Sequence, residues 1–250
     1  MTSTIFAANW KMHLGPGETR AFLDTFLSGY AARPDREVWF FPPAVSLETA
    51  AQRVTDRPDI RVGAQNVHWE PKGAYTGESS VGMVHDTGSR AVLVGHSERR
   101  HVFGETDEET ARKVRAVLAT GMVPVLCVGE KLGEREADRT LEVVHRQLGA
   151  LEDIDGHGLD GIVIAYEPVW AIGTGATATP ADAATVHAAI RSWMTAHGAT
   201  AAAVRVLYGG SVKPGNAEEL LAEQEIDGVL VGGASLQPDS WTQICTVPVD

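Results

Sequence analysis

Gly161-Ile162-Val163-Ile164-Ala165-Tyr166-Glu167-Pro168 holds the pattern that decides the fold. The run from 162 to 166 is apolar at nearly every position, whereas a half-exposed strand would alternate apolar and polar residues. Such a run is typical of a parallel strand that is covered on both faces. A carboxylate, Glu167, follows the run directly, and Pro168 stops the pattern. The same order, a short apolar strand and then a chemically special residue, recurs along the chain.

Eight runs of this kind occur in the 250 residues, with room for a helix between most of them. We predict strands at residues 5–8, 38–41, 60–63, 91–94, 123–128, 162–166, 204–208 and 228–231. Alternating strands and helices imply a parallel sheet. Eight such units in a chain of this length favour a closed barrel over an open doubly wound sheet. No linker or charge block divides the chain, so we expect an α/β fold with one (β/α)8 barrel domain over residues 1–250.

Helix signals lie between the predicted strands. Thr106-Asp107-Glu108-Glu109 is a capping box ahead of an amphipathic stretch that ends near Gly121. Thr179 and Pro180 provide a cap and a helix-compatible proline ahead of residues 183–194. Residues 141–148 and 217–221 also have helical periodicity. By contrast, the segment from Gln65 to Glu78 is marked by glycine and proline, so we predict a long loop there.

Composition and charge exclude several classes of function. The formal net charge of −12 argues against a nucleic-acid partner, which requires a basic face. No apolar run reaches the ~18 residues that span a bilayer, so we expect no membrane association. The N-terminus has no leader pattern, and a cytoplasmic location is the expectation. Cys127 and Cys245 fit neither a disulfide framework nor a zinc motif, and no carboxylate–histidine cluster has ligand spacing, so we predict no metal site.

Polar residues and glycines follow the predicted strands at their carboxyl ends. Parallel strands bring these ends to one rim of a barrel, where the active sites of such barrels lie. We therefore expect residues far apart in the sequence to share one cleft. The residues at these ends are Asn9 and Lys11, His96 to Glu98, Glu130, Glu167, Gly209 to Ser211, and Gly232 with Gly233.

Three of these residues are candidates for chemistry. Glu167 could act as a general base if its surroundings tune its pKa, or it could be a helix-capping or salt-bridged carboxylate. His96 could be a neutral hydrogen-bond donor near a helix N-terminus, or a structural histidine. Lys11 could provide a point charge for an anion, or be a solvated surface lysine. We expect the other histidines, such as His145, His187 and His197, at the surface.

Glycines cluster after the last two predicted strands. Gly209-Gly210-Ser211 and Gly232-Gly233-Ala234-Ser235 occupy the two loops that often bind phosphate on barrels, because glycines let backbone amides approach the anion. A third glycine segment, residues 172–178, has the G-x-G-x-x-A form of a dinucleotide fingerprint. It begins several residues beyond the strand and lacks the acidic residue that binds ribose, so we interpret it as a mobile lid.

Five segments together resemble the triosephosphate isomerase family, each at the expected strand end and in the expected order. The resemblance implies a TIM barrel and an aldose–ketose isomerase of glycolysis and gluconeogenesis. Such an enzyme interconverts dihydroxyacetone phosphate and D-glyceraldehyde 3-phosphate through an enediolate, without a cofactor. The segments are Ala8-Asn9-Trp10-Lys11-Met12, Gly95-His96-Ser97-Glu98-Arg99-Arg100, Ala165-Tyr166-Glu167-Pro168-Val169-Trp170-Ala171-Ile172-Gly173-Thr174-Gly175, Tyr208-Gly209-Gly210-Ser211-Val212 and Val231-Gly232-Gly233-Ala234-Ser235.

The resemblance also implies roles for single residues. Glu167 is similar to the base that moves the proton between carbons, and His96 to the neutral electrophile that polarises the carbonyl. Lys11 and Asn9 match groups that stabilise negative charge on the substrate oxygens, and Glu98 matches a buried acid that we expect to pair with Lys11. The residues that match the phosphate-holding amides are Gly173, Ser211, Gly232 and Gly233.

The lid and the assembly complete the comparison. Residues 168–178 match the family's lid, with Tyr208 and Ser211 positioned to latch it. Family members are homodimers in which a loop like Gln65–Glu78, with Thr76 near its tip, inserts beside the partner's first strand, and we expect the same here. Two departures are Ala176, where relatives often carry a larger residue, and Ser79, where a branched apolar residue is usual.

Two rival functions remain for such a chain. A metal-dependent epimerase or a Schiff-base aldolase would need a metal cluster or a lysine in a strand, and none of the five lysines falls in a predicted strand. A non-catalytic barrel that binds a phosphate ligand would be favoured by loss of Glu167, His96 or Lys11. All three residues are present, so the isomerase is the preferred reading.

Overall fold

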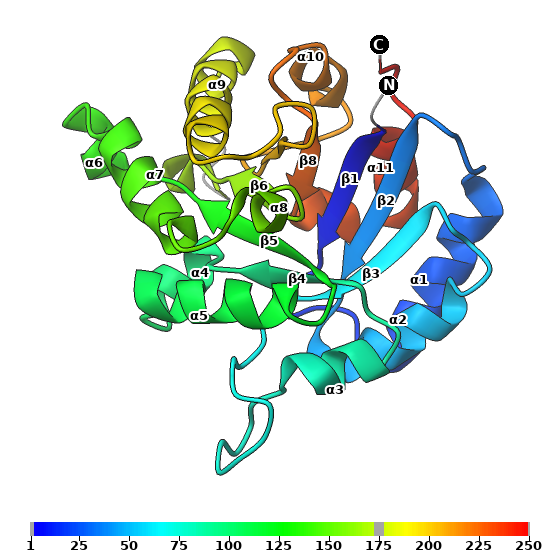
Figure 1. Cartoon of the computed structure of the whole chain (residues 1–250). Helices are drawn as coiled ribbons and strands as arrows, with labels where there is room; N and C mark the ends of the chain where they lie inside the picture. The colour runs from blue at the N-terminus through cyan, green and yellow to red at the C-terminus, as the bar shows by residue number, and fades with distance from the viewer. Residues whose placement is uncertain (1–2, 173–177, 250) are drawn as a thin grey trace.

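The computed structural model describes residues 3–172 and 178–249. Within them, eight parallel strands pair in chain order, and the last pairs with the first to close a barrel (Figure 1). This confirms the predicted (β/α)8 barrel. The strands are β1 (Thr4–Asn9), β2 (Arg36–Phe41), β3 (Ile60–Ala64), β4 (Ala91–Val94), β5 (Val123–Val128), β6 (Val163–Tyr166), β7 (Arg205–Tyr208) and β8 (Gly228–Val231).

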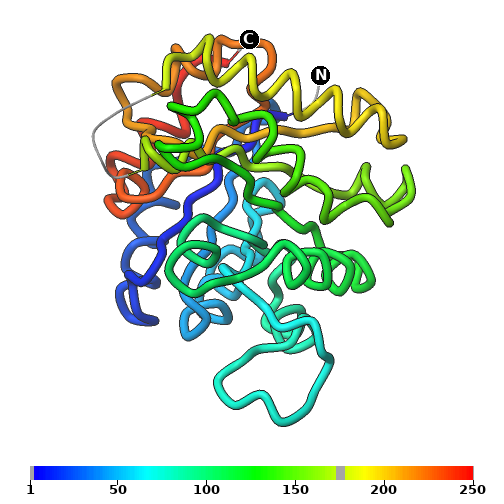
Figure 2. The backbone as a smooth tube through the Cα atoms, turned by 90° about the vertical axis from the view of Figure 1, so that its left-hand side faces the viewer, coloured from blue at the N-terminus to red at the C-terminus, as the bar shows by residue number. Residues whose placement is uncertain are grey.

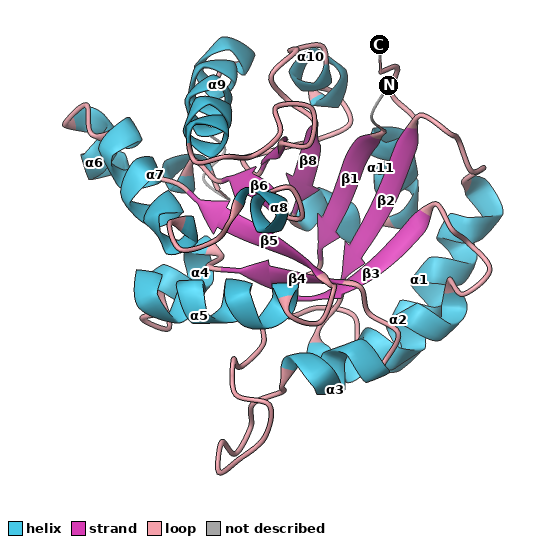
Figure 3. Ribbon diagram, in the orientation of Figure 1, coloured by secondary structure: helices cyan, strands magenta, loops and turns pink. Residues whose placement is uncertain are grey.

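Helices surround the barrel, as the ribbon coloured by secondary structure shows (Figure 3). In the described residues they are α1 (Pro16–Gly29), α2 (Leu47–Arg53), α3 (Val81–Asp86), α4 (Ser97–His101), α5 (Asp107–Leu118), α6 (Leu132–Glu136), α7 (Thr140–Leu148), α8 (Gly156–Leu159), α9 (Pro180–Ala196), α10 (Ala217–Leu221) and α11 (Pro238–Cys245). The predicted caps are confirmed at α5 and α9. Thr106 Oγ1 accepts from the N–H of Glu109 at 3.2 Å, and Thr179 Oγ1 accepts from that of Asp182 at 3.1 Å.

Apolar side chains on the two faces of the strands form two cores. One fills the barrel and includes Ala7, Trp39 and Leu93. The other lies between the strands and the helices, and includes Phe40 and Trp241. A strand that buries both faces must be apolar throughout, which explains the continuous runs in the sequence. Burying each large side chain contributes about 1.5–3 kcal/mol, so both cores stabilise the frame that carries the rim.

The predicted loop at residues 65–78 is confirmed, since it contains no helix or strand. It projects from the side of the barrel between β3 and α3, as the backbone trace shows (Figure 2). The His68 ring stacks on Trp69 and Tyr75, with centroids 4.2 and 4.1 Å apart. At its far end, the carbonyl of Ser79 accepts from the N–H of His68 at 2.8 Å. The loop is thus a projection whose conformation is held by contacts among its own residues.

One histidine differs from its prediction. His145 and His197 are exposed as expected, but His187 on α9 is fully buried. Its Nδ1 lies 3.1 Å from the carbonyl of Glu225, and its ring packs edge-on against Tyr166. Burial lowers the pKa of His187 from 6.5 to about 3, although the hydrogen bond to Glu225 opposes the shift. The helical pattern around His187 hides this, because its partner comes 38 residues later.

Two further features concern membranes and metals. Across residues 3–172 and 178–249, no helix combines the length and apolar character that crossing a bilayer requires. The same residues contain no group of three or more histidine, cysteine, aspartate or glutamate side chains that could hold a metal ion. Cys127 and Cys245 are both free and buried.

Candidate active site

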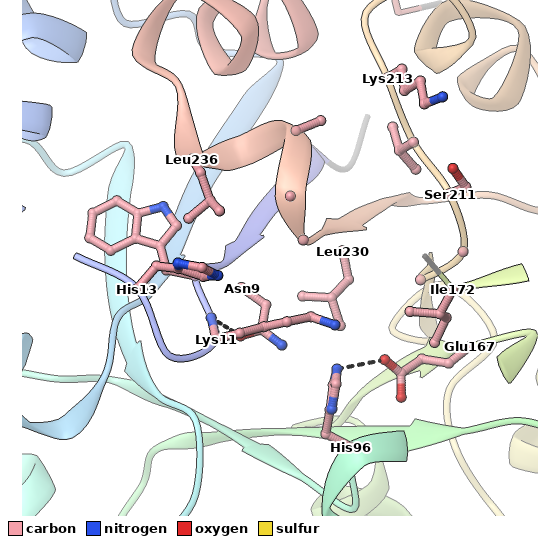
Figure 4. Close-up of a pocket in the computed structure, with 17 residues that line it drawn as sticks. Asn9, Lys11, His13, His96, Glu167, Ile172, Ser211, Lys213, Leu230 and Leu236 are labelled. Atoms are coloured by element: carbon pink, nitrogen blue, oxygen red, sulfur yellow. Dashed lines mark hydrogen bonds and ion pairs between the residues drawn. The ribbon is translucent and has the colours of Figure 1, made fainter. Parts of the chain in front are cut away.

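A cavity of about 280 Å³ opens at the carboxyl ends of the strands (Figure 4). Its lining comes from the ends of β1 and β8 and from the segments that follow β1, β4, β6, β7 and β8, and includes Asn9, Lys11, His96, Glu167 and Ser211. The volume is just below the usual range of pockets for drug-sized ligands, about 300–1,000 Å³. The parallel barrel therefore brings residues from both ends of the chain around a space that suits a small ligand.

Glu167 lies directly after β6 and is almost completely buried. One carboxylate oxygen is 2.9 Å from His96 Nε2, and the other accepts from the N–H of Ser97 at 2.9 Å. Burial alone would raise the pKa of this carboxyl. The charge that His96 carries when it is protonated, its hydrogen bond and the Ser97 amide act against burial, and the pKa of Glu167 is lowered below its ordinary value. Glu167 is thus held as a carboxylate although its side chain is buried.

His96 caps the N-terminus of α4. Its Nδ1 accepts from the N–H of Glu98 at 3.2 Å, and its Nε2 faces Glu167. Burial lowers the pKa of His96, but the Glu167 carboxylate raises it, and the net direction is upward. A proton on Nδ1 would nevertheless meet the N–H of Glu98 head-on. The two ring contacts therefore favour the neutral tautomer that carries its proton on Nε2 and donates it to Glu167.

Lys11 follows β1 with a left-handed backbone, φ +50°. Such a conformation costs of the order of 1–3 kcal/mol outside glycine and must be held by its surroundings. Asn9 Oδ1 accepts from the N–H of Lys11 at 3.0 Å, and Gln65 Nε2 donates to its carbonyl at 2.8 Å. These bonds aim the Lys11 ammonium toward His96 and Glu167, as the close-up shows (Figure 4).

Glu98 differs in part from its prediction. The structure pairs it with Lys11, with Nζ and Oε1 2.6 Å apart. Its side chain is not buried, since 46% of it is exposed. Glu98 lines a second cavity, of about 230 Å³, together with Met12, Asn66 and Phe103. Its side chain is exposed because this cavity is open to the outside of the chain, which the sequence around Glu98 does not reveal.

The opposite wall of the cavity, called the glycine wall below, is formed by residues that follow β7 and β8, namely Gly209, Gly210, Ser211, Gly232 and Gly233. A Cβ at Gly209 would lie 2.8 Å from Glu167 Cγ, and one at Gly232 would lie 3.3 Å from Lys11 Cε. Side chains at these positions would therefore displace Glu167 or the Lys11 ammonium. The 3-10 helix η4 (Gly233–Leu236) starts at the same wall. Backbone amides at such a position are the usual phosphate ligands of barrels. Gly173, the fourth predicted phosphate ligand, lies outside the described residues.

The predicted lid is described only at its two ends, and Ala176 lies outside the described residues. At the near end, 3-10 helix η3 (Val169–Ala171) follows Pro168, and Trp170 Nε1 donates to Glu130 at 2.8 Å. Glu130 is fully buried and also accepts from the Tyr166 hydroxyl at 3.1 Å. At the far end, Tyr208 is buried, and this burial raises the pKa of its hydroxyl to about 12.

Several residues of this site were not predicted. The N–H of Ser97 holds Glu167, and Glu130 holds the start of the lid. The sequence predicts that both residues follow strands, but it does not predict these contacts. His13 and Lys213 also line the cavity. The signal for Ser97 was its place directly after His96 in a strand-end turn. His13 and Lys213 gave no signal, because their distance from the cavity depends on how the loops fold.

The arrangement has the parts of a proton-transfer site. A carboxylate, an imidazole N–H and an ammonium group face one small cavity, and glycines form its other wall. The carboxylate can accept a proton from carbon, while the two donors can stabilise negative charge that develops on oxygen. The glycine wall can hold an anionic group away from the reacting centre.

Comparison with known proteins places this geometry in a family. A family model described as triosephosphate isomerase matches residues 4–247. The chain belongs to the triosephosphate isomerase family. A relative from Herpetosiphon aurantiacus, named triosephosphate isomerase, is 48% identical over 98% of both chains. A relative of the same name from Aquifex aeolicus is 47% identical, over 96% of this chain and 97% of its own. All five segments that resemble the triosephosphate isomerase family lie within the matched residues.

Proposed function

We propose that this chain interconverts dihydroxyacetone phosphate and D-glyceraldehyde 3-phosphate. The observation that carries the proposal is the contact of Glu167 with His96, at 2.9 Å, beside the Lys11 ammonium in one cavity. Membership of the triosephosphate isomerase family supports the choice of substrate. The reaction moves one proton between neighbouring carbons and one between their oxygens. It has no net redox change, so it requires no cofactor.

In the proposed reaction, Glu167 removes the proton from the carbon next to the carbonyl. The electron pair of the C–H bond moves into a carbon–carbon double bond, and the carbonyl oxygen becomes an enediolate oxygen. His96 and Lys11 stabilise that oxygen, and each preorganised donor of this kind contributes about 3–4 kcal/mol. His96 shuttles a proton between the two oxygens, and Glu167 returns its proton to the neighbouring carbon. Asn9 supports Lys11 through the bond from the Lys11 N–H to its Oδ1.

We assign the phosphate to the glycine wall, with Ser211, Gly232 and Gly233 as its amide donors and Gly173 as a donor from the lid. An enediolate readily expels phosphate, so water and free torsion must be excluded while it exists. We propose that residues 168–178 close over the cavity for this purpose, with Tyr208 and Ser211 as the latch. Lys213 lies at the same cavity, beside His13, and its ammonium attracts the dianion against the net charge of −12.

We propose that the chain works as a homodimer. Support comes from exposed apolar side chains, since Met12 is 93% exposed, Val45 74% and Phe103 67%. The projecting loop at residues 65–78 would insert beside the partner's first strand and cover the open surface at Lys11 and Glu98. Sedimentation should then give twice the chain mass for the protein, and a monomer for Thr76→Arg. A single species of one chain mass in both would contradict the dimer. We also propose that the homodimer is located in the cytoplasm.

A coupled assay tests the proposed function directly. Purified protein with a chelator present should convert dihydroxyacetone phosphate to D-glyceraldehyde 3-phosphate, and His96→Ala should lower turnover by about 10²–10³, as loss of a preorganised donor does. The non-catalytic alternative predicts binding of inorganic phosphate without conversion. Absence of turnover in protein that binds phosphate would therefore replace the isomerase with that alternative.

A further inference from the structure

Behind the base, a buried amide holds the peptide of Gly129, which directly follows β5. The N–H of Gly129 donates to Gln147 Oε1 at 2.7 Å, and Gln147 Nε2 donates back to the carbonyl of Gly129 at 3.2 Å. Gln147 belongs to α7, and its side chain is almost entirely buried. We propose that Gln147 is a positioning residue for the base Glu167, acting through Gly129; the proposal rests on the function given above.

Gly129 and Glu167 are packed backbone to backbone. A Cβ at Gly129 would lie 1.7 Å from the carbonyl oxygen of Glu167 and 2.6 Å from its carbonyl carbon. No side chain fits in such a space, so any shift of the Gly129 peptide toward β6 must move the backbone of Glu167. Glycine at this position is explained by the approach of the base's own main chain.

Hydrogen bonds on both sides of Gly129 extend the coupling. The N–H of Glu167 donates to the carbonyl of Val128 at 2.7 Å, and the N–H of Val169 donates to that of Glu130 at 3.0 Å. The backbone of residues 167–169 is therefore fixed in place by its hydrogen bonds to residues 128–130. Gln147 holds the middle residue of this segment, Gly129, from the side of helix α7.

The pair of hydrogen bonds between Gln147 and Gly129 requires an amide side chain. Gly129 lies just past the end of the β5 ladder, and within residues 3–172 and 178–249 no group except Gln147 forms a hydrogen bond with its N–H or carbonyl. An apolar side chain would leave a buried donor and a buried acceptor without partners, which a peptide avoids by moving. A carboxylate would accept from the N–H but repel the carbonyl.

The effect should fall on the chemical step. Misplacing a reacting group by about 1 Å can cost about 10² in rate, whereas the glycine wall after β7 and β8 holds the other end of the substrate. Moving the Glu167 backbone therefore lowers kcat and leaves KM nearly unchanged. A glutamine that only stabilised the fold would lower the melting temperature without changing kcat per folded molecule.

Three variants test the proposal. Gln147→Met keeps the approximate size and loses both hydrogen bonds, so kcat should fall at least tenfold, with KM within about twofold of the wild type. Gln147→Glu can form both bonds only when protonated, because its O–H then replaces the amide N–H. Its kcat relative to the wild type should be close to one at acidic pH and fall as the pH rises, while the ratio for Gln147→Met stays flat. Val144→Ala, in the same helix and fully buried, serves as the matched stability control and should keep its kcat.

The outcomes separate two failures. If Gln147→Met keeps kcat within twofold of the wild type while the folded wild type is active, Gln147 does not position the base. The same conclusion follows if Gln147→Glu matches the wild type at every pH, or if Gln147→Met raises KM and leaves kcat unchanged. If the wild type itself has no isomerase activity, the proposed function fails instead.

Discussion

The two rims of the barrel use the same kinds of charged residues for opposite purposes. At the carboxyl rim, Glu167, His96 and Lys11 point into a cavity that a ligand can enter. At the amino rim, charged side chains pair with one another and with backbone groups. Asp227, just before β8, accepts from Arg191 at 2.8 Å and from the N–H of Val206 at 2.7 Å.

The contrast continues elsewhere on the amino rim. Arg36 starts β2, and its side chain is completely buried. It donates to the carbonyl of Cys245 at 2.6 Å and pairs with Asp35 at 2.7 Å. The Arg36 hydrogen bond lowers the pKa of Asp35 well below its ordinary value, although burial opposes this. The lesson is that satisfied charges stabilise the strand ends, whereas charges aimed at a shared cavity are available for chemistry. Changes at the two rims should therefore separate activity from stability.

The largest effect is expected at the carboxyl rim. Glu167→Ala removes the proposed base and should lower kcat by about 10²–10⁴, because no other carboxylate contacts His96 Nε2 in the described residues. Inorganic phosphate should bind with nearly unchanged affinity, since the glycine wall is intact. Steady-state kinetics and a phosphate titration measure both. Glu108→Ala, at an exposed helix position, is the control that should keep full activity.

A smaller loss is expected for the ammonium. Lys11→Met should lower kcat/KM by about 10²–10³, the usual consequence of removing one preorganised donor to a developing oxyanion. Lys131→Met removes an exposed lysine near the same rim and should change kcat/KM less than about twofold. Equal losses for the two variants would mean that Lys11 contributes only long-range attraction.

The reverse pattern is expected at the amino rim. Asp227→Asn keeps the size of the side chain but removes the ion pair with Arg191. The free energy of unfolding should fall by about 1.5–3 kcal/mol, the range for hydrogen bonds to charged groups, and kcat should not change. Denaturant unfolding measures the first quantity and the coupled assay the second. A fall in kcat per folded molecule would contradict the claim that the amino rim contributes to stability and not to activity.

The effect that is smallest near neutral pH concerns the pH dependence of stability. His187 has a pKa of about 3 when folded, against 6.5 ordinarily, so the unfolded chain binds more protons between these values. Its contribution to stability is therefore fully present above about pH 6.5 and is lost progressively as the pH falls toward 3. In His187→Phe, this part of the acid destabilisation should disappear, and the melting temperature should fall less steeply with acid than in the wild type. Parallel curves for the two proteins would contradict the buried neutral imidazole.

Strand positions could be predicted because both faces of each strand are buried. The predicted bounds of β4, β5 and β8 agree with the structure, since their apolar runs are bounded by turn residues. The start of β2 was missed, because the charged Arg36 interrupts the apolar pattern. Besides the adjacent Asp35, the partners of its buried guanidinium are the carbonyls of Cys245 and Val247, more than two hundred residues away. Long-range partners of this kind cannot be inferred from local periodicity.

The site shows the same limit. Parallel strands require the strand-end residues to share a rim, so the convergence of Glu167, His96 and Lys11 follows from topology. The orientation of single groups does not. The Ser97 amide on Glu167 and the Gln147 amide on Gly129 depend on loop and helix placement. The exposure of Glu98 also depends on the surface around it, as does the burial of His187.

Isomerisation in heavy water tests the central claim most directly. If the Glu167 carboxylate carries the proton between carbons, it exchanges that proton with solvent, and the product should contain carbon-bound deuterium. Glu167→Ala should form labelled product at least 10² more slowly. Product that forms at the normal rate without deuterium would indicate a direct hydride shift, and normal formation of labelled product by Glu167→Ala would remove Glu167 from the reaction. Either result would contradict the account.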